Sequence, residues 1–271
     1  MRHDAGVTLV VAHRGSSGVR AEHTLAAYET AIAEGADALE CDVRLTRDGV
    51  LVCVHDRRVN RTSDGRGPVS ALELAELEEL DFASWKSRSG DQLLEAAWEE
   101  PDLDDGRVLT LERLVQLAIS QERPVELHIE TKHPTRYGGL VEKSLVDLLE
   151  RYGLARPLTR SVSRVTVMSF APTSLRRVHV MAPDLPTVYL MARVPLRYRD
   201  GTLPPRIGIA GPDVAIVKAH PRYVERVHAM GNRVHVWTVD AEPDIDLMIE
   251  LGVDAIISNH PRRVIRRLHR D

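Results

Sequence analysis

The sequence predicts an α/β protein of the (β/α)8 or TIM-barrel type, with a small insertion, a β-hairpin plus a helix, after the second strand. Three observations support this fold. Eight short strand-like runs occur along the chain, amphipathic segments separate most of them, and the length of 271 residues suits such a barrel. We expect a single barrel domain over 1–271, with the insertion at about 45–106.

The expected strands are runs rich in valine, isoleucine and other strand-forming residues. They lie at 9–13, 38–44, 125–131, 165–170, 187–191, 214–218, 233–239 and 254–258. Amphipathic segments with helical spacing lie at 24–34, 110–121, 140–152, 222–230 and 243–251. Four of these segments end at glycines, which readily adopt the left-handed conformation that closes a helix: Gly35, Gly153, Gly231 and Gly252.

The weakest part of the alternation follows the strand at 187–191. Pro195, Pro204 and Pro205 interrupt any helix there, because an internal proline removes a backbone hydrogen bond and clashes with the preceding turn. We therefore expect an irregular connection before the next strand.

The insertion begins as a hairpin, because the second strand is followed directly by a second β-rich run. Asp48-Gly49 is typical of a two-residue hairpin loop. With that loop, cross-strand partners sum to 97, and Asp42 is opposite His55. Side chains alternate between the two faces of a strand, so Glu40, Asp42 and His55 are expected on one face near the barrel mouth.

A helix is expected after the hairpin, at 70–80. Ser70 and Glu73 have the spacing of a capping box, in which each side chain satisfies a backbone amide of the first turn. The chain then returns to the barrel order at Thr110.

Composition excludes several classes of protein. Apolar residues make up 43% and charged residues 28%, as in ordinary globular chains. Thirty-six lysines and arginines against 40 acidic residues give a net charge of −4, which argues against a nucleic-acid partner. No run approaches the ~18 apolar residues of a membrane span, so no stable membrane insertion is expected.

Two features concern the compartment. The N-terminus lacks the apolar core and cleavage site of a signal peptide. The expected hairpin register places Cys41 and Cys53 on opposite faces, which argues against a disulfide, and free thiols suit a reducing environment. We expect a cytoplasmic protein, and the sequence is compatible with a homo-oligomer.

Carboxylates cluster at the expected carboxyl ends of two strands. Glu40 and Asp42 share one face of the second strand, and Glu130 lies level with them on the third. Carboxylates this close repel one another unless a cation lies between them. Oxygen ligands suit Mg²⁺ or Ca²⁺, so we interpret the three as ligands of one divalent metal ion. The alternative is ion pairing of Glu40 and Asp42 with Arg44 or Arg57.

Basic residues occupy the same barrel face. His13 and Arg14 end the first strand, Lys132 ends the third, and His55 is expected nearby. Arg14 and Lys132 supply positive charge for an anionic substrate, and two histidines can serve as general base and general acid for displacement at phosphorus. The alternative for His13 is a histidine bonded into a loop. These residues predict a site suited to a small phosphodiester.

Eight motifs, in order along residues 9–260, resemble those of the glycerophosphodiester phosphodiesterases. They are His13-Arg14-Gly15, Glu22-His23-Thr24, Glu40-Cys41-Asp42-Val43, Thr46-Arg47-Asp48-Gly49, Val54-His55-Asp56, Arg61-Thr62, Glu130-Thr131-Lys132 and Val236-Trp237-Thr238-Val239. The resemblance implies a TIM-barrel hydrolase that releases glycerol 3-phosphate and an alcohol through a cyclic phosphate.

The resemblance also implies roles for single residues. His13 and His55 would form the acid/base pair, Glu40, Asp42 and Glu130 would bind the metal, and Arg14 and Lys132 would contact the phosphate. Trp237 would form an apolar wall against the glycerol carbons; the alternative is a core residue at the barrel top. One motif departs from the family pattern Pro-Glu-Asn-Thr, because His23 replaces the asparagine.

Three rival functions are less well supported by the sequence. A Schiff-base aldolase would use Lys132, but it leaves the carboxylates and histidines unexplained. A lysophospholipase D acting on lipids would need an apolar channel, and the chain has only two phenylalanines and three tryptophans to line one. A non-catalytic phosphate-binding barrel would not need the full set of seven reactive groups.

Overall fold

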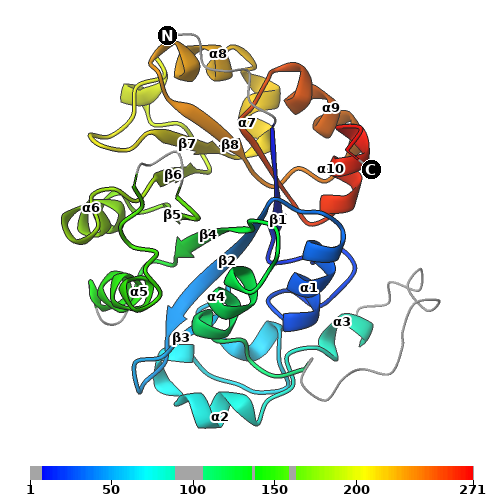
Figure 1. Cartoon of the computed structure of the whole chain (residues 1–271), viewed down its shortest axis with the longest axis vertical. Helices are drawn as coiled ribbons and strands as arrows, with labels where there is room; N and C mark the ends of the chain where they lie inside the picture. The colour runs from blue at the N-terminus through cyan, green and yellow to red at the C-terminus, as the bar shows by residue number, and fades with distance from the viewer. Residues whose placement is uncertain (1–7, 89–105, 136–137, 159–162, 271) are drawn as a thin grey trace.

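The computed structural model describes residues 8–88, 106–135, 138–158 and 163–270, and these form a closed barrel of eight parallel strands (Figure 1). The strands follow one another around the barrel, and β1 pairs with β2 to close it. This confirms the predicted fold class. In chain order they are β1 (Leu9–His13), β2 (Ala38–Leu45), β4 (Glu126–Thr131), β5 (Val165–Ser169), β6 (Thr187–Met191), β7 (Ile209–Pro212), β8 (Arg233–Val236) and β9 (Ala255–Ser258).

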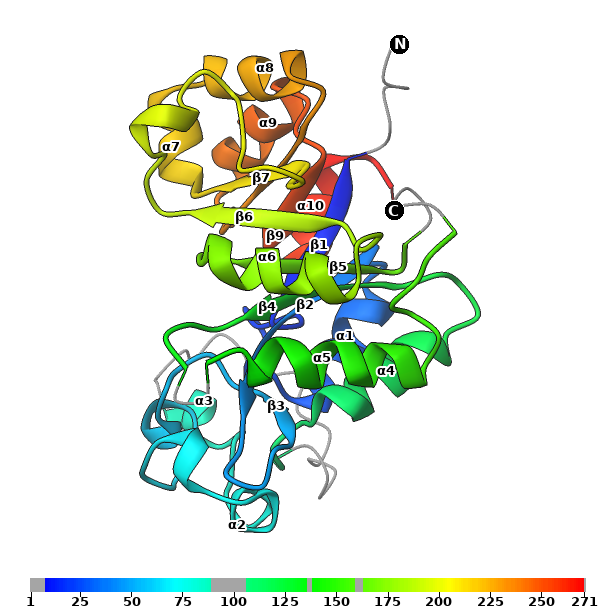
Figure 2. The ribbon, with the colours of Figure 1, turned by 90° about the vertical axis from the view of Figure 1, so that its left-hand side faces the viewer.

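Helices surround the strands, and their apolar sides pack against the outer faces of the strands to form the main core (Figures 1 and 2). Thr24 and Thr110 cap α1 and α4 by accepting a hydrogen bond from a first-turn amide. In chain order the helices are α1 (Leu25–Ala33), α4 (Leu111–Ile119), α5 (Leu140–Arg151), α6 (Pro172–Met181), α7 (Val214–Ala219), α8 (Arg222–Ala229), α9 (Glu242–Glu250) and α10 (Pro261–Arg267). Within the described ranges, none of the helices has the length and apolar character required to cross a membrane.

The strand predicted at 214–218 is wrong: these residues lie in α7, and the strand is Ile209–Pro212. The run Val-Ala-Ile-Val is too short to show a period that separates strand from helix. Asp213 decides the outcome, because its carboxylate accepts a hydrogen bond from the amide of Ala215 at 2.8 Å and caps the helix. The preceding connection is irregular as expected, with only the short 3₁₀ turn η5 (Leu196–Tyr198).

The hairpin prediction holds for its two strands but is wrong in register. β3 (Leu51–Cys53) is antiparallel to β2, and Val43 pairs with Cys53, so partners sum to 96. Thr46 closes the loop by donating its amide to the carbonyl of Val50 at 2.9 Å. The loop therefore has three residues. Its last residue, Gly49, has a φ of +87°, and a left-handed residue at this position is common in three-residue hairpin loops.

The one-residue difference in register moves side chains to the other face. Cys53 joins Cys41 in the core outside the barrel. The prediction that Cys53 shares the face of Glu40 and Asp42 is therefore wrong. Both cysteines are buried free thiols. His55 reaches the mouth for another reason: β3 ends at Cys53, and Arg44 then holds the carbonyl of His55 at 2.7 Å.

The helix predicted at 70–80 is shorter and begins later. Ser70 lies in a 3₁₀ turn, η2 (Val69–Ala71), and α2 is Leu74–Glu78. The capping box is formed by Glu73 and Glu76, so the predicted pair with Ser70 is wrong. The other short elements of this region are η1 (Val59–Arg61) and α3 (Trp85–Arg88), and the region has a small apolar cluster of its own. It lies at one end of the molecule in Figure 2.

The barrel interior is filled by side chains at alternate strand positions. Below the mouth, the rings of His128 on β4 and His235 on β8 are stacked with centroids 5.3 Å apart, and both are buried. Glu126 lies two residues before His128, near the end of β4 that is farther from the mouth. Its Oε2 atom is 3.5 Å from Nε2 of His128. The mouth layer above them carries the candidate site.

Candidate active site

Three carboxylates meet at the mouth of the barrel. Glu40 and Asp42 project from β2 and Glu130 from β4, and Asp42 is paired with Glu130 in the parallel register. All three are buried, and one oxygen of each lies within 4.8 Å of the others. Two oxygens on opposite sides of a cation at about 2.4 Å are about 4.8 Å apart, so the three fit one coordination sphere of a hard divalent ion.

The negative charge of this triad is only partly compensated by neighbouring side chains. Lys132 lies 2.9 Å from Glu130 and 3.2 Å from Asp42, and Arg14 lies 3.0 Å from Asp42. Burial and the charge of Asp42 raise the pKa of Glu130 to about 8 and hold the pKa of Glu40 well above its usual range. A bound dication would relieve this repulsion.

Asp42 is the carboxylate with the most cationic surroundings. Burial alone would raise its pKa, but a hydrogen bond from His23 and the charges of Arg14 and Lys132 hold the pKa well below its usual value. The Nε2 atom of His23 lies 3.0 Å from Asp42, and its Nδ1 atom lies 2.8 Å from the hydroxyl of Tyr28. His23, at the position where the sequence departs from the family pattern, therefore holds the carboxylate with one ring nitrogen.

His13 is held by a chain of hydrogen bonds from the last strand. Its Nδ1 atom lies 2.7 Å from Oδ1 of Asn259, whose amide nitrogen donates to Asp240 at 2.7 Å. Because the amide nitrogen is engaged, Oδ1 must accept, so Nδ1 of His13 carries the proton and Nε2 presents a lone pair. Nε2 lies 4.0 Å from Glu40, and burial and the charge of Arg14 lower the pKa of His13 to about 4.

His55 has a different kind of partner. Its Nδ1 atom lies 2.7 Å from the carboxylate of Asp56, which also accepts from Arg61 at 2.7 Å. Arg61 in turn binds both oxygens of Glu22. Hydrogen bonds from Arg61 and His55 outweigh partial burial and lower the pKa of Asp56 to about 2, so His55 is oriented by a carboxylate that stays ionised. Burial lowers the pKa of His55, whose side chain is 33% exposed.

One wall of the cavity is apolar. Trp237 donates its indole N–H to the carbonyl of Gly211 at 2.7 Å, and Phe170 packs edge-on against it with ring centroids 5.3 Å apart. Lys132 lies 5.9 Å from the Phe170 ring, at the border between the polar and apolar walls. The cavity of about 100 Å³ is lined by His13, Arg14, Glu40, His55, Glu130, Lys132, Met168, Phe170, Leu190, Trp237, Thr238 and Ile257.

The structure therefore brings every predicted site residue to one mouth. Seven of the eight line the cavity, and Asp42 lies beside it in the carboxylate triad. Three further residues of the site were not predicted from the sequence: Asn259, Asp240 and Phe170. Asn259 follows the last barrel strand, so its position at a carboxyl-terminal strand end could have signalled it.

Comparison with known proteins points to a single family. Residues 13–263 match the Glycerophosphoryl diester phosphodiesterase family. A probable glycerophosphodiester phosphodiesterase 1 of Mycobacterium tuberculosis is 47% identical over 263 residues, which are 96% of this chain and 92% of that protein. A glycerophosphodiester phosphodiesterase of Bacillus subtilis is 33% identical, over 93% of this chain and 84% of that one.

Solved structures agree. An Oleispira antarctica phosphodiesterase in complex with the product sn-glycerol-3-phosphate is 25% identical, with a TM-score of 0.80, and the match covers 98% of each chain. A Silicibacter pomeroyi structure described as a glycerophosphoryl diester phosphodiesterase is 27% identical, also with a TM-score of 0.80, over 98% of this chain and 94% of that one.

Proposed function

Because the chain belongs to the glycerophosphoryl diester phosphodiesterase family, we propose that it hydrolyses glycerophosphodiesters to glycerol 3-phosphate and an alcohol by metal-dependent, two-histidine catalysis. The observation that carries the proposal is the meeting of three buried carboxylates and two imidazoles at one barrel mouth. The Oleispira antarctica relative was solved with that product bound, which supports the choice of substrate.

Glu40, Asp42 and Glu130 would hold the metal ion. A divalent ion there, Mg²⁺ or Ca²⁺, would supply a Lewis acid that lowers the pKa of the glycerol 2-hydroxyl and offsets charge on the phosphate. Arg14 and Lys132 add positive charge on the same side of the cavity, and their guanidinium and ammonium groups would orient the phosphate oxygens.

His13 is suited to remove the proton in the first step. Its Nε2 lone pair faces the carboxylate triad, and its low pKa keeps it neutral near pH 7. The 2-hydroxyl oxygen then forms a bond to phosphorus while the bond from phosphorus to the alcohol oxygen breaks, which leaves a cyclic phosphate.

His55 is suited to donate the proton to the departing alcohol. The carboxylate of Asp56 lies 2.7 Å from Nδ1 of His55 and stabilises its protonated form, whereas Nδ1 of His13 donates to a neutral amide. Water then opens the cyclic phosphate with the two roles reversed, and Trp237 and Phe170 would line the side that contacts the glycerol carbons.

Asn259 is a positioning residue for His13 in this scheme. In the Asn259→Ala variant, kcat is expected to fall by about 10–100-fold with KM nearly unchanged, as for other residues that orient a reacting group. The hydrogen bond that His13 donates to Asn259 raises the pKa of His13, so its loss should move the acid limb of the pH–rate profile to lower pH. Asn232→Ala is the control, because Asn232 is half-buried and does not line the catalytic cavity. An unshifted profile with unchanged kcat in Asn259→Ala would exclude the role.

Release of glycerol 3-phosphate is the direct test of the function. A coupled assay should detect it from glycerophosphocholine or glycerophosphoethanolamine. Product formation only from lysophospholipids would favour the lysophospholipase D alternative, and tight binding of glycerophosphocholine without turnover would favour a non-catalytic barrel. A Schiff-base role is disfavoured, because the charges of Asp42 and Glu130 outweigh burial and raise the pKa of Lys132, which keeps it protonated.

A further inference from the structure

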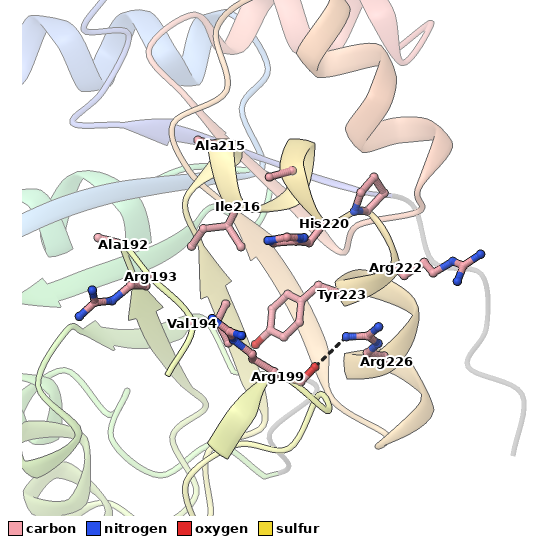
Figure 3. Close-up of a pocket in the computed structure, with 12 residues that line it drawn as sticks. Ala192, Arg193, Val194, Arg199, Ala215, Ile216, His220, Arg222, Tyr223 and Arg226 are labelled. Atoms are coloured by element: carbon pink, nitrogen blue, oxygen red, sulfur yellow. Dashed lines mark hydrogen bonds between the residues drawn. The ribbon is translucent and has the colours of Figure 1, made fainter. Parts of the chain in front are cut away.

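A second, larger cavity lies on the outside of the barrel. It has a volume of about 790 Å³ and lies between the β6–β7 connection and helices α7 and α8 (Figure 3). None of its lining residues lines the catalytic cavity. The cavity exists because the β6–β7 connection forms only η5 where a barrel normally has a covering helix.

The lining of this cavity is cationic. It contains four arginines and His220, and no carboxylate. In Figure 3, Arg199 and Arg226 lie next to one another near Tyr223, and the side chains of Arg193 and Arg222 extend outward at opposite edges of the cavity. A guanidinium nitrogen of Arg226 donates to the carbonyl of Arg199 at 3.1 Å.

These arginines lack the close acidic partners that other arginines of the chain have. Across the described ranges, no ion pair within 4.0 Å joins any of the four to a carboxylate. In contrast, Arg267 and Arg270 on the same molecule each bind an aspartate at 2.6 Å. Asp200, next to Arg199, accepts from the amide and hydroxyl of Thr202, and burial together with the charge of Asp200 raises the pKa of Tyr223 to about 12. Four arginines without such an ion pair therefore surround one cavity, in a chain whose net charge is −4.

The floor of the cavity is less polar than its edges. Val194, Ile216 and the ring of Tyr223 contribute apolar surface, and Tyr223 is buried. An apolar floor with cationic groups at separated edges suits a small carbon scaffold that bears several anionic groups. The planar guanidinium fork matches phosphate oxygens in two-point hydrogen bonding.

We propose that this cavity binds a small organic anion that carries two or more phosphate groups. The separation of the arginines into an edge at Arg193, an edge at Arg222 and the Arg199–Arg226 pair favours several phosphates over one. The concave shape favours a small molecule over a flat lipid surface.

The test is isothermal titration calorimetry of the full-length protein in magnesium-containing buffer of low ionic strength. The probes are 2,3-bisphosphoglycerate and inorganic phosphate. We expect the bisphosphate to bind at least tenfold more tightly than phosphate, and R193E/R222E to weaken its binding at least tenfold. Arg176→Glu, an exposed arginine on α6 outside the cavity, should leave the affinity unchanged. Lys132→Ala, which alters the catalytic cavity, should also leave it unchanged.

Three results would overturn the proposal. They are the absence of bisphosphate binding, equal binding by R193E/R222E and the parent protein, and a loss confined to Lys132→Ala, which would place the anion in the catalytic cavity. Sedimentation with vesicles tests whether the same surface binds a membrane instead. Arginine-dependent binding to phosphatidylglycerol but not phosphatidylcholine vesicles, without binding of the bisphosphate, would assign the surface to a membrane. Thermal unfolding of each variant is the control for correct folding.

Discussion

Replacement of His13 or His55 by alanine is expected to lower kcat by about 10²–10⁴-fold, the usual contribution of a general acid or base. Both side chains lie at the cavity mouth and are partly exposed, so the free energy of unfolding should change by no more than about 1 kcal/mol. Steady-state kinetics and thermal unfolding of the two variants test this. Normal turnover in either variant would remove that histidine from the mechanism.

A substrate with a better leaving group separates the two roles. Release of p-nitrophenol from glycerophospho-p-nitrophenol needs little protonation of the departing oxygen, but it still needs removal of the 2-hydroxyl proton. His55→Ala should therefore recover much of its activity on this substrate, whereas His13→Ala should not. Recovery of His13→Ala alone would reverse the assignment of acid and base.

Removal of the metal ion is expected to abolish activity, and added Mg²⁺ or Ca²⁺ should restore it. Without the cation, the crowded carboxylates repel the phosphate as well as one another, and the Lewis acid is lost. Loss of a residue that hydrogen-bonds to a metal ligand typically weakens metal affinity by about 10–100-fold. Glu130→Gln removes a ligand itself and should weaken the affinity by more than this. Calorimetric titration with the metal and activity after dialysis against EDTA measure both effects.

The matched control for Glu130→Gln lies on the same strand. Glu126 lies four residues before Glu130 on β4 and faces the same side of the strand, but it is near the opposite end of the barrel. Its side chain is 33% exposed. Glu126→Gln should keep the metal affinity and kcat of the parent protein. Full activity in EDTA, or equal losses in the two variants, would contradict the assignment of the carboxylate triad.

Much of the barrel could be predicted because its signals are local. Strand periodicity, helix caps and terminal glycines specify most elements, and the parallel order then brings the strand ends to one mouth. The errors arose where local signals were balanced. The run at 214–218 is apolar in either conformation, and Asp48-Gly49 suits both two- and three-residue loops, so one residue of register moved Cys53 to the other face.

The site was predictable to the same degree. Glu40, Asp42 and Glu130 could be placed together because their strands pair in register. The tautomer of His13 could not be predicted. It depends on Asn259, which is 246 residues away, and on the hydrogen bond that the Asn259 amide nitrogen donates to Asp240. The network of Asp56, Arg61 and Glu22 that orients His55 likewise joins the insertion to the loop after β1. Such contacts depend on tertiary packing and leave no periodic trace in the sequence.

Whether the three carboxylates bind one metal ion can be seen by anomalous diffraction from crystals of this protein soaked with Mn²⁺. We expect one strong peak about 2.0–2.6 Å from carboxylate oxygens of Glu40, Asp42 and Glu130, with His13 and His55 flanking it across the cavity. A peak bound elsewhere, or no peak between these three side chains at saturating Mn²⁺, would contradict it.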